Sequence, residues 1–435
     1  MRVLLLGATG LIGSAVAARL AGAGHDVTGV ARHIDTLARR VPVAGWLRID
    51  LREATLPQDW LPHLAGIDAV VNCAGVLQDN LRDSTARVHR DAPSALWAAC
   101  REAGVGRIVQ VSAIGVDRAA PTNFSRTKNE GDSALEASGL DWVILRPSVV
   151  VGRPAYGGTA LIRALAALPL VPRFPEAGPA DVVMLDDVAE TVLRLLAPGA
   201  ASHVALELAG PERLAFADIV AAFRRWLGWP PAREIAVPGF LLAAAWRAGD
   251  LLAWLGWRPP IRSTARREIA RGAIGVGAIG VGAAWREATG IVPQRLADAL
   301  AASPATVQER WFARLYLLKP VALGAFALFW LVTGLISLGP GRDEAIRMME
   351  ATAAARWAGP TVIGGALFDV AMGLALMVRR TVRPALVTAV FATLAYLVAG
   401  TWLMPSLWAD PLGPLMKVVP ILALNLLCLA ILDDR

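Results

Sequence analysis

The fold of this chain is decided by the stretch Gly7-Ala8-Thr9-Gly10-Leu11-Ile12-Gly13 and by the apolar run Val3-Leu4-Leu5-Leu6 before it. The apolar run predicts a buried strand, and the glycines predict a tight turn into a helix. Without Cβ atoms the backbone of such a turn can approach a phosphate, and the helix N-terminus directs unpaired N–H groups toward the anion. The stretch therefore predicts a dinucleotide site at the first strand–helix turn. A secretory signal peptide is the competing interpretation, which the interrupting glycines and the next expected strand disfavour.

Strand-like and helix-like segments alternate through the first half of the chain. The expected strands are the apolar segments Val3–Leu6, Val27–Ala31, Trp46–Ile49, Ala69–Cys73, Ile108–Val111 and Trp142–Leu145. Helices are expected between them, for example at Ser94–Ala103 and Lys128–Ala137, each closed by a glycine. This alternation predicts a Rossmann-type, doubly wound parallel α/β sheet. Residues 1–237 are predicted to form this domain, with a smaller substrate-side portion after Gly152 that includes a strand at Ala205–Leu208.

The second half of the chain is far more apolar than the first. Hydrophobic residues make up 55% of the chain and charged residues 18%, and the apolar excess lies after about Leu317. Four hydrophobic spans are expected there, each near the roughly 20 residues that cross a bilayer core. They are Val321–Leu338, Thr361–Met377, Leu386–Met404 and Leu415–Ile431. Residues 311–435 are thus predicted to be an all-α, four-helix transmembrane domain. Residues 238–310 are predicted to be a helical linker, whose apolar helix at Pro238–Trp257 is either buried or lies on the membrane surface.

Charge and cysteine content narrow the class of protein. The formal net charge is +7, and the chain has 15 tryptophans. The basic residues form no long run with interleaved aromatic residues, so no nucleic-acid partner is expected. Basic charge and tryptophan together are typical of a protein held at an anionic membrane surface. Three cysteines lie far apart and have no metal-ligand spacing with the five histidines. No metal site is therefore expected, and a reducing cytoplasm is the default compartment.

Four motifs of the first half belong together as a set. They are Gly7-x-x-Gly10-x-x-Gly13, Asn72-Cys73-Ala74-Gly75, Val111-Ser112-Ala113-Ile114-Gly115 and Arg146-Pro147-Ser148. The set resembles the atypical short-chain dehydrogenase/reductase family, and especially its NAD(P)-binding proteins similar to the large accessory subunit of respiratory complex I. This resemblance covers about residues 1–300. The four-span tail resembles a DoxX-like membrane domain, so the whole chain resembles bacterial fusions of the two.

The resemblance implies which residues surround the cofactor. The pyrophosphate would lie on Gly7, Thr9, Gly10, Leu11, Ile12 and Gly13. Asp50 and Leu51, which follow the third strand, would flank the adenine. Cys73, Ala74 and Gly75, which follow the fourth strand, would line the ribose side of the cofactor.

Arg32 bears on the choice of cofactor. It stands just after the second expected strand, where an acidic residue would bind a ribose 2′-hydroxyl. A guanidinium suits a 2′-phosphate better, so NADP is expected in preference to NAD, whose use stays open.

One catalytic residue of the family is missing. Such reductases use a Tyr-x-x-x-Lys pair and a serine, and the tyrosine passes the proton while the lysine holds the nicotinamide ribose. Ser112 and Lys128 are in place, but Phe124 stands where the tyrosine should be. Tyr156 could supply a phenol from the substrate side. The other solution is an acceptor that needs no such acid, for example a flavin or a quinone.

The expected function is that of a membrane-anchored NAD(P)-dependent oxidoreductase without the usual catalytic tyrosine. The alternative is a non-catalytic NAD(P)-binding scaffold or redox sensor for a membrane complex. The expected partners are the lipid bilayer, a small-molecule or quinone acceptor and, in the alternative, that complex. We expect a multi-pass protein of the inner membrane with a cytoplasmic N-terminal domain, since no export signal is convincing. Asp369 lies mid-span and is expected to serve a proton relay, contact a quinone or hydrogen-bond Asn425.

Overall fold

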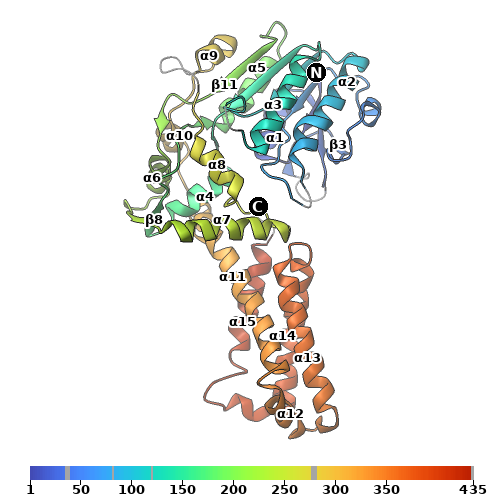
Figure 1. Cartoon of the computed structure of the whole chain (residues 1–435), viewed down its shortest axis with the longest axis vertical. Helices are drawn as coiled ribbons and strands as arrows, with labels where there is room; N and C mark the ends of the chain where they lie inside the picture. The colour runs from blue at the N-terminus through green and yellow to red at the C-terminus, as the bar shows by residue number, and fades with distance from the viewer. Residues whose placement is uncertain (35–39, 81–82, 119–120, 276–281, 433–435) are drawn as a thin grey trace. The chain divides into compact units, whose positions relative to one another are not determined.

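The computed structural model describes residues 1–34, 40–80, 83–118, 121–275 and 282–432. These residues form two compact units (Figure 1). The first comprises Met1–Asp250 and Pro260–Arg310, and the second comprises Leu251–Pro259 and Trp311–Arg435. Residues 260–310 therefore fold with the first unit.

The first unit is built on a parallel sheet. Among the described residues, the strands of this sheet are β1 (Arg2–Leu6), β2 (Asp26–Ala31), β3 (Gly45–Arg48), β4 (Ala69–Asn72), β5 (Arg107–Val111), β6 (Trp142–Pro147) and β11 (Val204–Leu208). Their spatial order is β11-β6-β5-β4-β1-β2-β3, and every neighbouring pair is parallel. The chain winds outward from β1 in one direction and then from β4 in the other. This order confirms the predicted doubly wound sheet, in which ligands bind where the winding reverses.

Helices cover both faces of the sheet, as a doubly wound fold requires. The helices are α1 (Leu11–Gly22), α2 (Ala92–Ala103), α3 (Asn123–Glu136) and α5 (Leu185–Leu195). Side chains of β1 alternate between the faces. Val3 and Leu5 pack in one core with α1 and α5, whereas Leu4 and Leu6 pack in a second core with α2 and α3.

The strand at Ala205–Leu208 lies elsewhere than predicted. It was assigned to the smaller portion, but β11 pairs with β6 and extends the main sheet. The reason is helix α5, which packs beside α1 and carries the chain across the sheet to its free edge. The smaller portion contains helices α4 (Gly157–Ala166) and α6 (Phe216–Trp226) and pairs of short strands. These pairs are β7 (Val150–Val151) with β10 (Val183–Met184), β8 (Leu170–Arg173) with β13 (Arg233–Ala236), and β9 (Ala180–Asp181) with β12 (Arg213–Leu214).

Helix α8 (Ser263–Arg271) is docked onto the start of α3. The Ser125 hydroxyl donates to Glu268 Oε1 at 2.9 Å, and Arg271 Nη1 donates to Ser125 Oγ at 2.7 Å. Farther along, Ala273 forms a parallel bridge with Ala180. The sequence Ala273-Ile274-Gly275-Val276-Gly277 is repeated directly after itself as Ala278-Ile279-Gly280-Val281-Gly282, which predicts a flexible linker, and residues 276–281 of this repeat lie outside the described residues.

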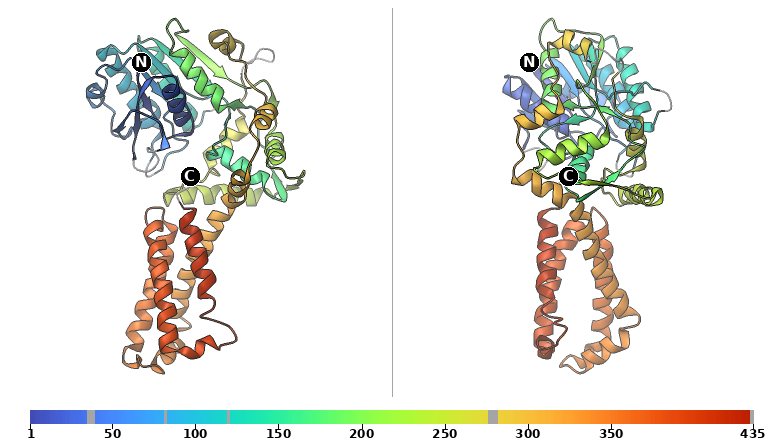
Figure 2. Two further views of the ribbon diagram at one scale, coloured as in Figure 1. Left: turned by 180° about the vertical axis from the view of Figure 1, so that it is seen from behind. Right: turned by 90° about the vertical axis from the view of Figure 1, so that its left-hand side faces the viewer.

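The second unit is a helical bundle. In the described part of the chain, the three helices long and apolar enough to cross a membrane are α11 (Val307–Leu338), α13 (Ala358–Met377) and α14 (Val382–Leu403). They share an apolar core with α15 (Val418–Ala430), and α12 (Arg342–Glu350) precedes α13 (Figure 2). Less than a third of each membrane-spanning segment is buried within the protein, so apolar side chains face outward as a lipid environment requires.

The fourth predicted span is shorter than expected. Residues Leu415–Ile431 were predicted to cross the bilayer, but α15 has only 13 residues. The chain turns just before it at Gly413, whose φ of +56° lies in the left-handed region, and the helix begins only at Val418. Three of the four expected spans are thus confirmed in length.

Helix α7 (Gly239–Trp254) carries exposed apolar side chains. Phe240 is 72% exposed, Leu251 65% and Trp254 68%. An apolar helix with this exposure is not the buried core helix that was one of its two interpretations. The membrane-surface interpretation stays as a prediction for α7.

Candidate functional site

The glycine turn between β1 and α1 packs tightly against the end of β4. Gly7 has a φ of +70°, and a Cβ on it would lie 2.9 Å from the backbone of Ala74. A Cβ on Gly13 would lie 2.2 Å from the Gly7 carbonyl oxygen, which also accepts from Gly10 N at 2.9 Å. Only glycine fits at these positions without moving the backbone.

The glycine turn leaves backbone N–H groups available to donate hydrogen bonds to an anion. Gly10 caps α1 without a side-chain hydrogen bond, and the first N–H groups of a helix have no partner within it. Thr9, Leu11 and Ile12 are half-buried around this point. The turn therefore offers backbone N–H groups and a helix dipole to a phosphate, which fits the pyrophosphate of a dinucleotide.

Charged residues gather where β2 and β3 end. Arg32 Nη2 lies 2.9 Å from Asp83 Oδ1, in an ion pair that the sequence did not predict. Arg52 Nε donates to both Asp50 oxygens, at 3.1 and 3.0 Å, and Arg52 Nη2 donates to Oδ2 at 2.6 Å. Partial burial favours a higher pKa for Asp50, but the hydrogen bonds and charge of Arg52, with the charge of Arg32, lower it. Asp50 stays ionised, and a 2′-phosphate on Arg32 would compete with Asp83. Leu51 is buried beside this cluster.

The loop after β4 brings Cys73, Ala74 and Gly75 next to Lys128. A Cβ on Gly75 would lie 3.6 Å from Lys128 Nζ and 3.7 Å from His89 Nε2, both ordinary contact distances. The fold of the loop depends on Asn72, whose Oδ1 accepts from Ala74 N at 3.0 Å. Burial raises the pKa of the Cys73 thiol to about 12, against the opposing charge of Lys128. Cys73 therefore lines the site as an uncharged thiol and does not act as a nucleophile.

The side chains of Lys128 and Ser112 both form hydrogen bonds within the protein. Lys128 Nζ donates to the Val111 carbonyl at 2.9 Å, and burial lowers its pKa while the charge of Asp132 opposes this shift. The Ser112 hydroxyl donates to Asp132 Oδ2 at 2.7 Å. Asp132 is fully buried, burial raises its pKa, and its Oδ1 has no hydrogen-bond partner among the described residues. The serine proton is thus directed to a carboxylate instead of toward a substrate.

His89 was not predicted and lies close to Lys128. It stands on a π-helical turn, η4 (Arg87–Asp91). Its Nε2 accepts from Val76 N at 3.0 Å, so the proton sits on Nδ1, which donates to Thr127 Oγ1 at 2.8 Å. Burial, and secondarily the charge of Lys128, holds the pKa of His89 well below its ordinary value. His89 is therefore neutral with both nitrogens engaged, and it is no replacement for the missing acid.

Phe124 and Tyr156 occupy different surroundings. The Phe124 ring meets His89 edge-on, with centroids 5.5 Å apart. Tyr156 stands at the start of α4, where its backbone N donates to Thr159 Oγ1 at 3.1 Å and its ring is partly exposed. Among the described residues no hydrogen bond joins Tyr156 to Ser112 or Lys128. A catalytic role for Tyr156 stays a prediction.

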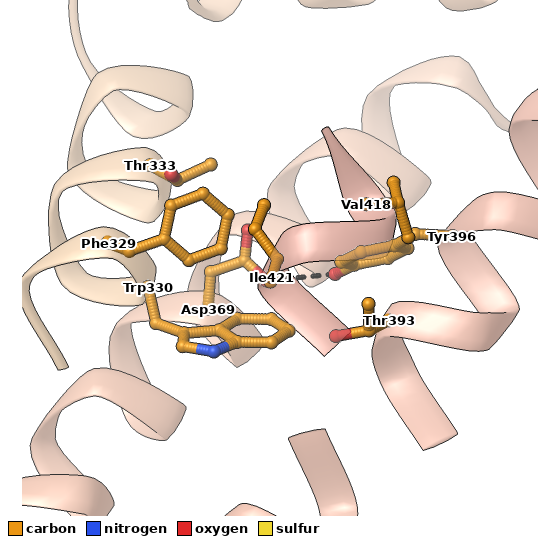
Figure 3. Close-up of a pocket in the computed structure, with 8 residues that line it drawn as sticks. All are labelled: Phe329, Trp330, Thr333, Asp369, Thr393, Tyr396, Val418 and Ile421. Carbon is orange, nitrogen blue, oxygen red and sulfur yellow. Dashed lines mark hydrogen bonds between the residues drawn. The ribbon is translucent and has the colours of Figure 1, made fainter. Parts of the chain in front are cut away.

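A second candidate site lies inside the helical bundle, in a pocket of about 90 Å³ (Figure 3). Tyr396 Oη donates to Asp369 Oδ1 at 2.9 Å within it. The residues that line it are Phe329, Trp330, Thr333, Asp369, Thr393, Tyr396, Val418 and Ile421. The expected hydrogen bond from Asp369 to Asn425 is absent among the described residues, because Tyr396 reaches the carboxylate instead. Asn425 is fully buried, and its side-chain N and O have no hydrogen-bond partner in the described structure.

Two family models match this chain. A model of NAD(P)H-binding proteins matches residues 7–197, which hold the glycine turn, Lys128 and Ser112. A model of the DoxX-like family matches residues 327–426, which hold Asp369 and Tyr396. The chain joins an NAD(P)H-binding domain to a DoxX-like domain. The resemblance drawn from the motifs is therefore confirmed for both parts.

Individual relatives resemble the N-terminal part. An uncharacterized protein of Mycobacterium tuberculosis is 31% identical over 230 residues, which are 52% of this chain but only 23% of that protein. This chain thus spans about a quarter of that relative. The ceramide reductase of Caulobacter vibrioides is 24% identical over 250 residues, 56% of this chain and 76% of the enzyme. A Bacillus cereus UDP-glucuronic acid 4-epimerase, solved with NAD, covers 73% of this chain and 100% of its own, with a TM-score of 0.53 at 17% identity. That structural likeness shows the fold alone.

Proposed function

We propose that this protein is a membrane-anchored, NADP(H)-dependent oxidoreductase that works without the usual tyrosine acid. The observation that carries the proposal is Lys128, a buried cation held beside Gly75 in an NAD(P)H-binding domain. The glycine turn would hold the pyrophosphate, Arg32 the 2′-phosphate and Lys128 the nicotinamide ribose. NADP(H), when bound, supplies or accepts the hydride.

The acceptor is proposed to need no proton from a tyrosine. Phe124 has no proton to give, and the Ser112 hydroxyl is committed to Asp132 at 2.7 Å. A quinone or a flavin meets this requirement. The Caulobacter relative is named a ceramide reductase, which indicates a lipid substrate for that protein, and the three helices long enough to cross a membrane support a location of this chain at the bilayer. A membrane-borne acceptor is therefore favoured over a water-soluble ketone.

Oxidation of NADPH by the purified full chain tests this proposal. Absorbance at 340 nm is followed with a panel of quinones, flavins and carbonyl compounds. Turnover with a quinone or flavin that is lost in Lys128→Met supports the oxidoreductase. The alternative, a cofactor-binding scaffold or redox sensor, is favoured by the paired state of Ser112 and Asp132. It predicts tight NADPH binding with no oxidation by any member of the panel.

Cofactor choice is expected to depend on Arg32. Arg32→Asp should weaken NADPH binding by about 10- to 100-fold, the value of one or two hydrogen bonds to a charged group, and change NADH binding little. Calorimetric titration of both cofactors measures the ratio of the dissociation constant of NADH to that of NADPH. Arg101→Asp makes the same charge change at an exposed residue of α2 and should leave the ratio unaltered. Tighter binding of NADH than of NADPH by the unmodified chain would contradict the assignment.

The N-terminal domain is proposed to face the cytoplasm, where NADP(H) is available. Arg379 and Arg380 lie between α13 and α14, Arg383 lies in the first turn of α14, and all three should remain inside by the positive-inside rule. An alkaline phosphatase joined near Thr381 should then be inactive, and one joined near Asp410 should be active. The reverse pattern would overturn this orientation.

A further inference from the structure

We propose that the pocket inside the helical bundle binds an organic ammonium ion, with its cationic head against Asp369 and the rings of Phe329, Trp330 and Tyr396. This inference does not depend on the proposed oxidoreductase activity, because every residue of the pocket belongs to the second unit.

Asp369 forms no ion pair with a basic side chain among the residues that the structure describes. It is 7% exposed and lies in the middle of α13, and its hydrogen bond comes from the neutral phenol of Tyr396 at 2.9 Å. None of the eight described residues that line the pocket is basic. Acids inside a membrane are costly, and they commonly pair with a cation and mark functional sites. A cationic ligand would complete the pair.

Aromatic rings surround this acid. Trp330 and Tyr396 have centroids 6.2 Å apart at an interplanar angle of 36°, and Phe329 lies 5.9 Å from Trp330. Figure 3 shows the Asp369 carboxyl between the Phe329 and Trp330 rings on one side and Tyr396 on the other. Ring faces attract cations, and aromatic cages recognise alkylated ammonium groups in this way. The pocket combines such a cage with a carboxylate.

The size of the pocket limits the head group. An engineered protein cavity of about 150 Å³ binds benzene, and this pocket, at about 90 Å³, is smaller. It therefore admits a head of a few heavy atoms, such as a protonated or methylated amine, and not a ring system. Phe329 is 41% and Tyr396 44% exposed at its edge, so the rest of an amphiphilic ligand can extend into lipid. The Thr393 hydroxyl is buried without a hydrogen-bond partner among the described residues, and its oxygen can accept from an ammonium N–H.

Calorimetric titration of phenyltrimethylammonium into the purified full chain, in an uncharged detergent, tests this proposal. The unmodified chain should bind the cation, and the neutral isostere tert-butylbenzene should not compete. Asp369→Asn should weaken binding by at least about 10-fold, since it removes the charge and keeps the shape. Asp343→Asn makes the same change at an exposed residue of α12 and should bind as the unmodified chain does.

Phe329→Leu, which removes one wall of the cage, is the second variant and should weaken binding several-fold. The thermal unfolding of each variant, followed by the helical circular dichroism signal in the same detergent, serves as the check of folding. The proposal is overturned if the unmodified chain gives no saturable heat, if tert-butylbenzene competes equally, or if Asp369→Asn and Asp343→Asn behave alike. Ammonium binding by a chain that never oxidises NADPH would support this site and contradict only the proposed activity.

Discussion

Gly13→Ala should weaken binding of NADPH by the full chain about 100-fold. The added Cβ would lie 2.2 Å from the Gly7 carbonyl oxygen and 2.8 Å from its carbon, and both atoms belong to the backbone of the phosphate-binding turn. Relief of this overlap requires the turn to open, which displaces the N–H groups that α1 offers to the pyrophosphate. Overpacking of this kind costs about 3 kcal/mol at its upper range, or about 100-fold in the dissociation constant. Fluorescence titration with NADPH measures the loss.

Gly22→Ala is the matched control for this change. Gly22 is the last residue of the same helix, and a Cβ on it meets no atom within 4 Å. Alanine also favours helix over glycine, so the variant should bind NADPH normally and unfold no more easily than the unmodified chain. Normal NADPH binding by Gly13→Ala would show that the cofactor does not lie on this turn.

Phe124→Tyr should create ketone reductase activity that the unmodified chain lacks. The new phenol would supply the proton that a phenyl ring cannot, beside Ser112 and Lys128. General acid–base catalysis contributes about 10²- to 10⁴-fold to rate, and the lower end is expected because Ser112 donates to Asp132. Reduction of cyclohexanone with NADPH, followed at 340 nm, measures the gain.

Two control variants distinguish the effect of the added phenol from the effect of altered packing. Phe124→Leu alters the contact with His89 without adding a hydroxyl and should give no activity. Lys128→Met in the Phe124→Tyr background should remove the gain, since the lysine cation stabilises the phenolate. Robust ketone reduction by the unmodified chain, unchanged by Tyr156→Phe, would contradict this account of the site.

The structural features that could be predicted from the sequence are those that depend on residues adjacent in the chain. The run from Val3 to Gly13 contains its own strand, turn and helix start, and the structure has them in that order. Strand β11 was misplaced because its pairing with β6 depends on where α5 carries the chain, and periodicity does not record that path. Helix α15 is shorter than the hydrophobic span because residues 415–417 form turns before the helix begins at Val418, which hydropathy alone does not reveal.

The partners of the site residues were harder to predict. Asp132 could have been anticipated, because it lies four residues after Lys128 and so shares its helix face. His89 lies on the η4 turn and Asp83 in the loop before it, and no local sequence pattern links them to Lys128 or Arg32. In the bundle, Tyr396 and not Asn425 bonds Asp369, since the rotation of α14 and α15 about their axes is set by packing.

Hydride transfer from bound NADPH is the reaction proposed for this protein, and a single-turnover experiment distinguishes it from cofactor binding alone. The full chain is loaded with NADPH that carries deuterium at C4, on one face in one sample and on the other face in a second. Each sample is then mixed with the most active quinone or flavin, and absorbance at 340 nm is followed. If the protein transfers the hydride, oxidation of NADPH should be slowed by deuterium on one face and unaffected by deuterium on the other. NADPH that stays bound and is never oxidised, with any acceptor, would contradict this proposal.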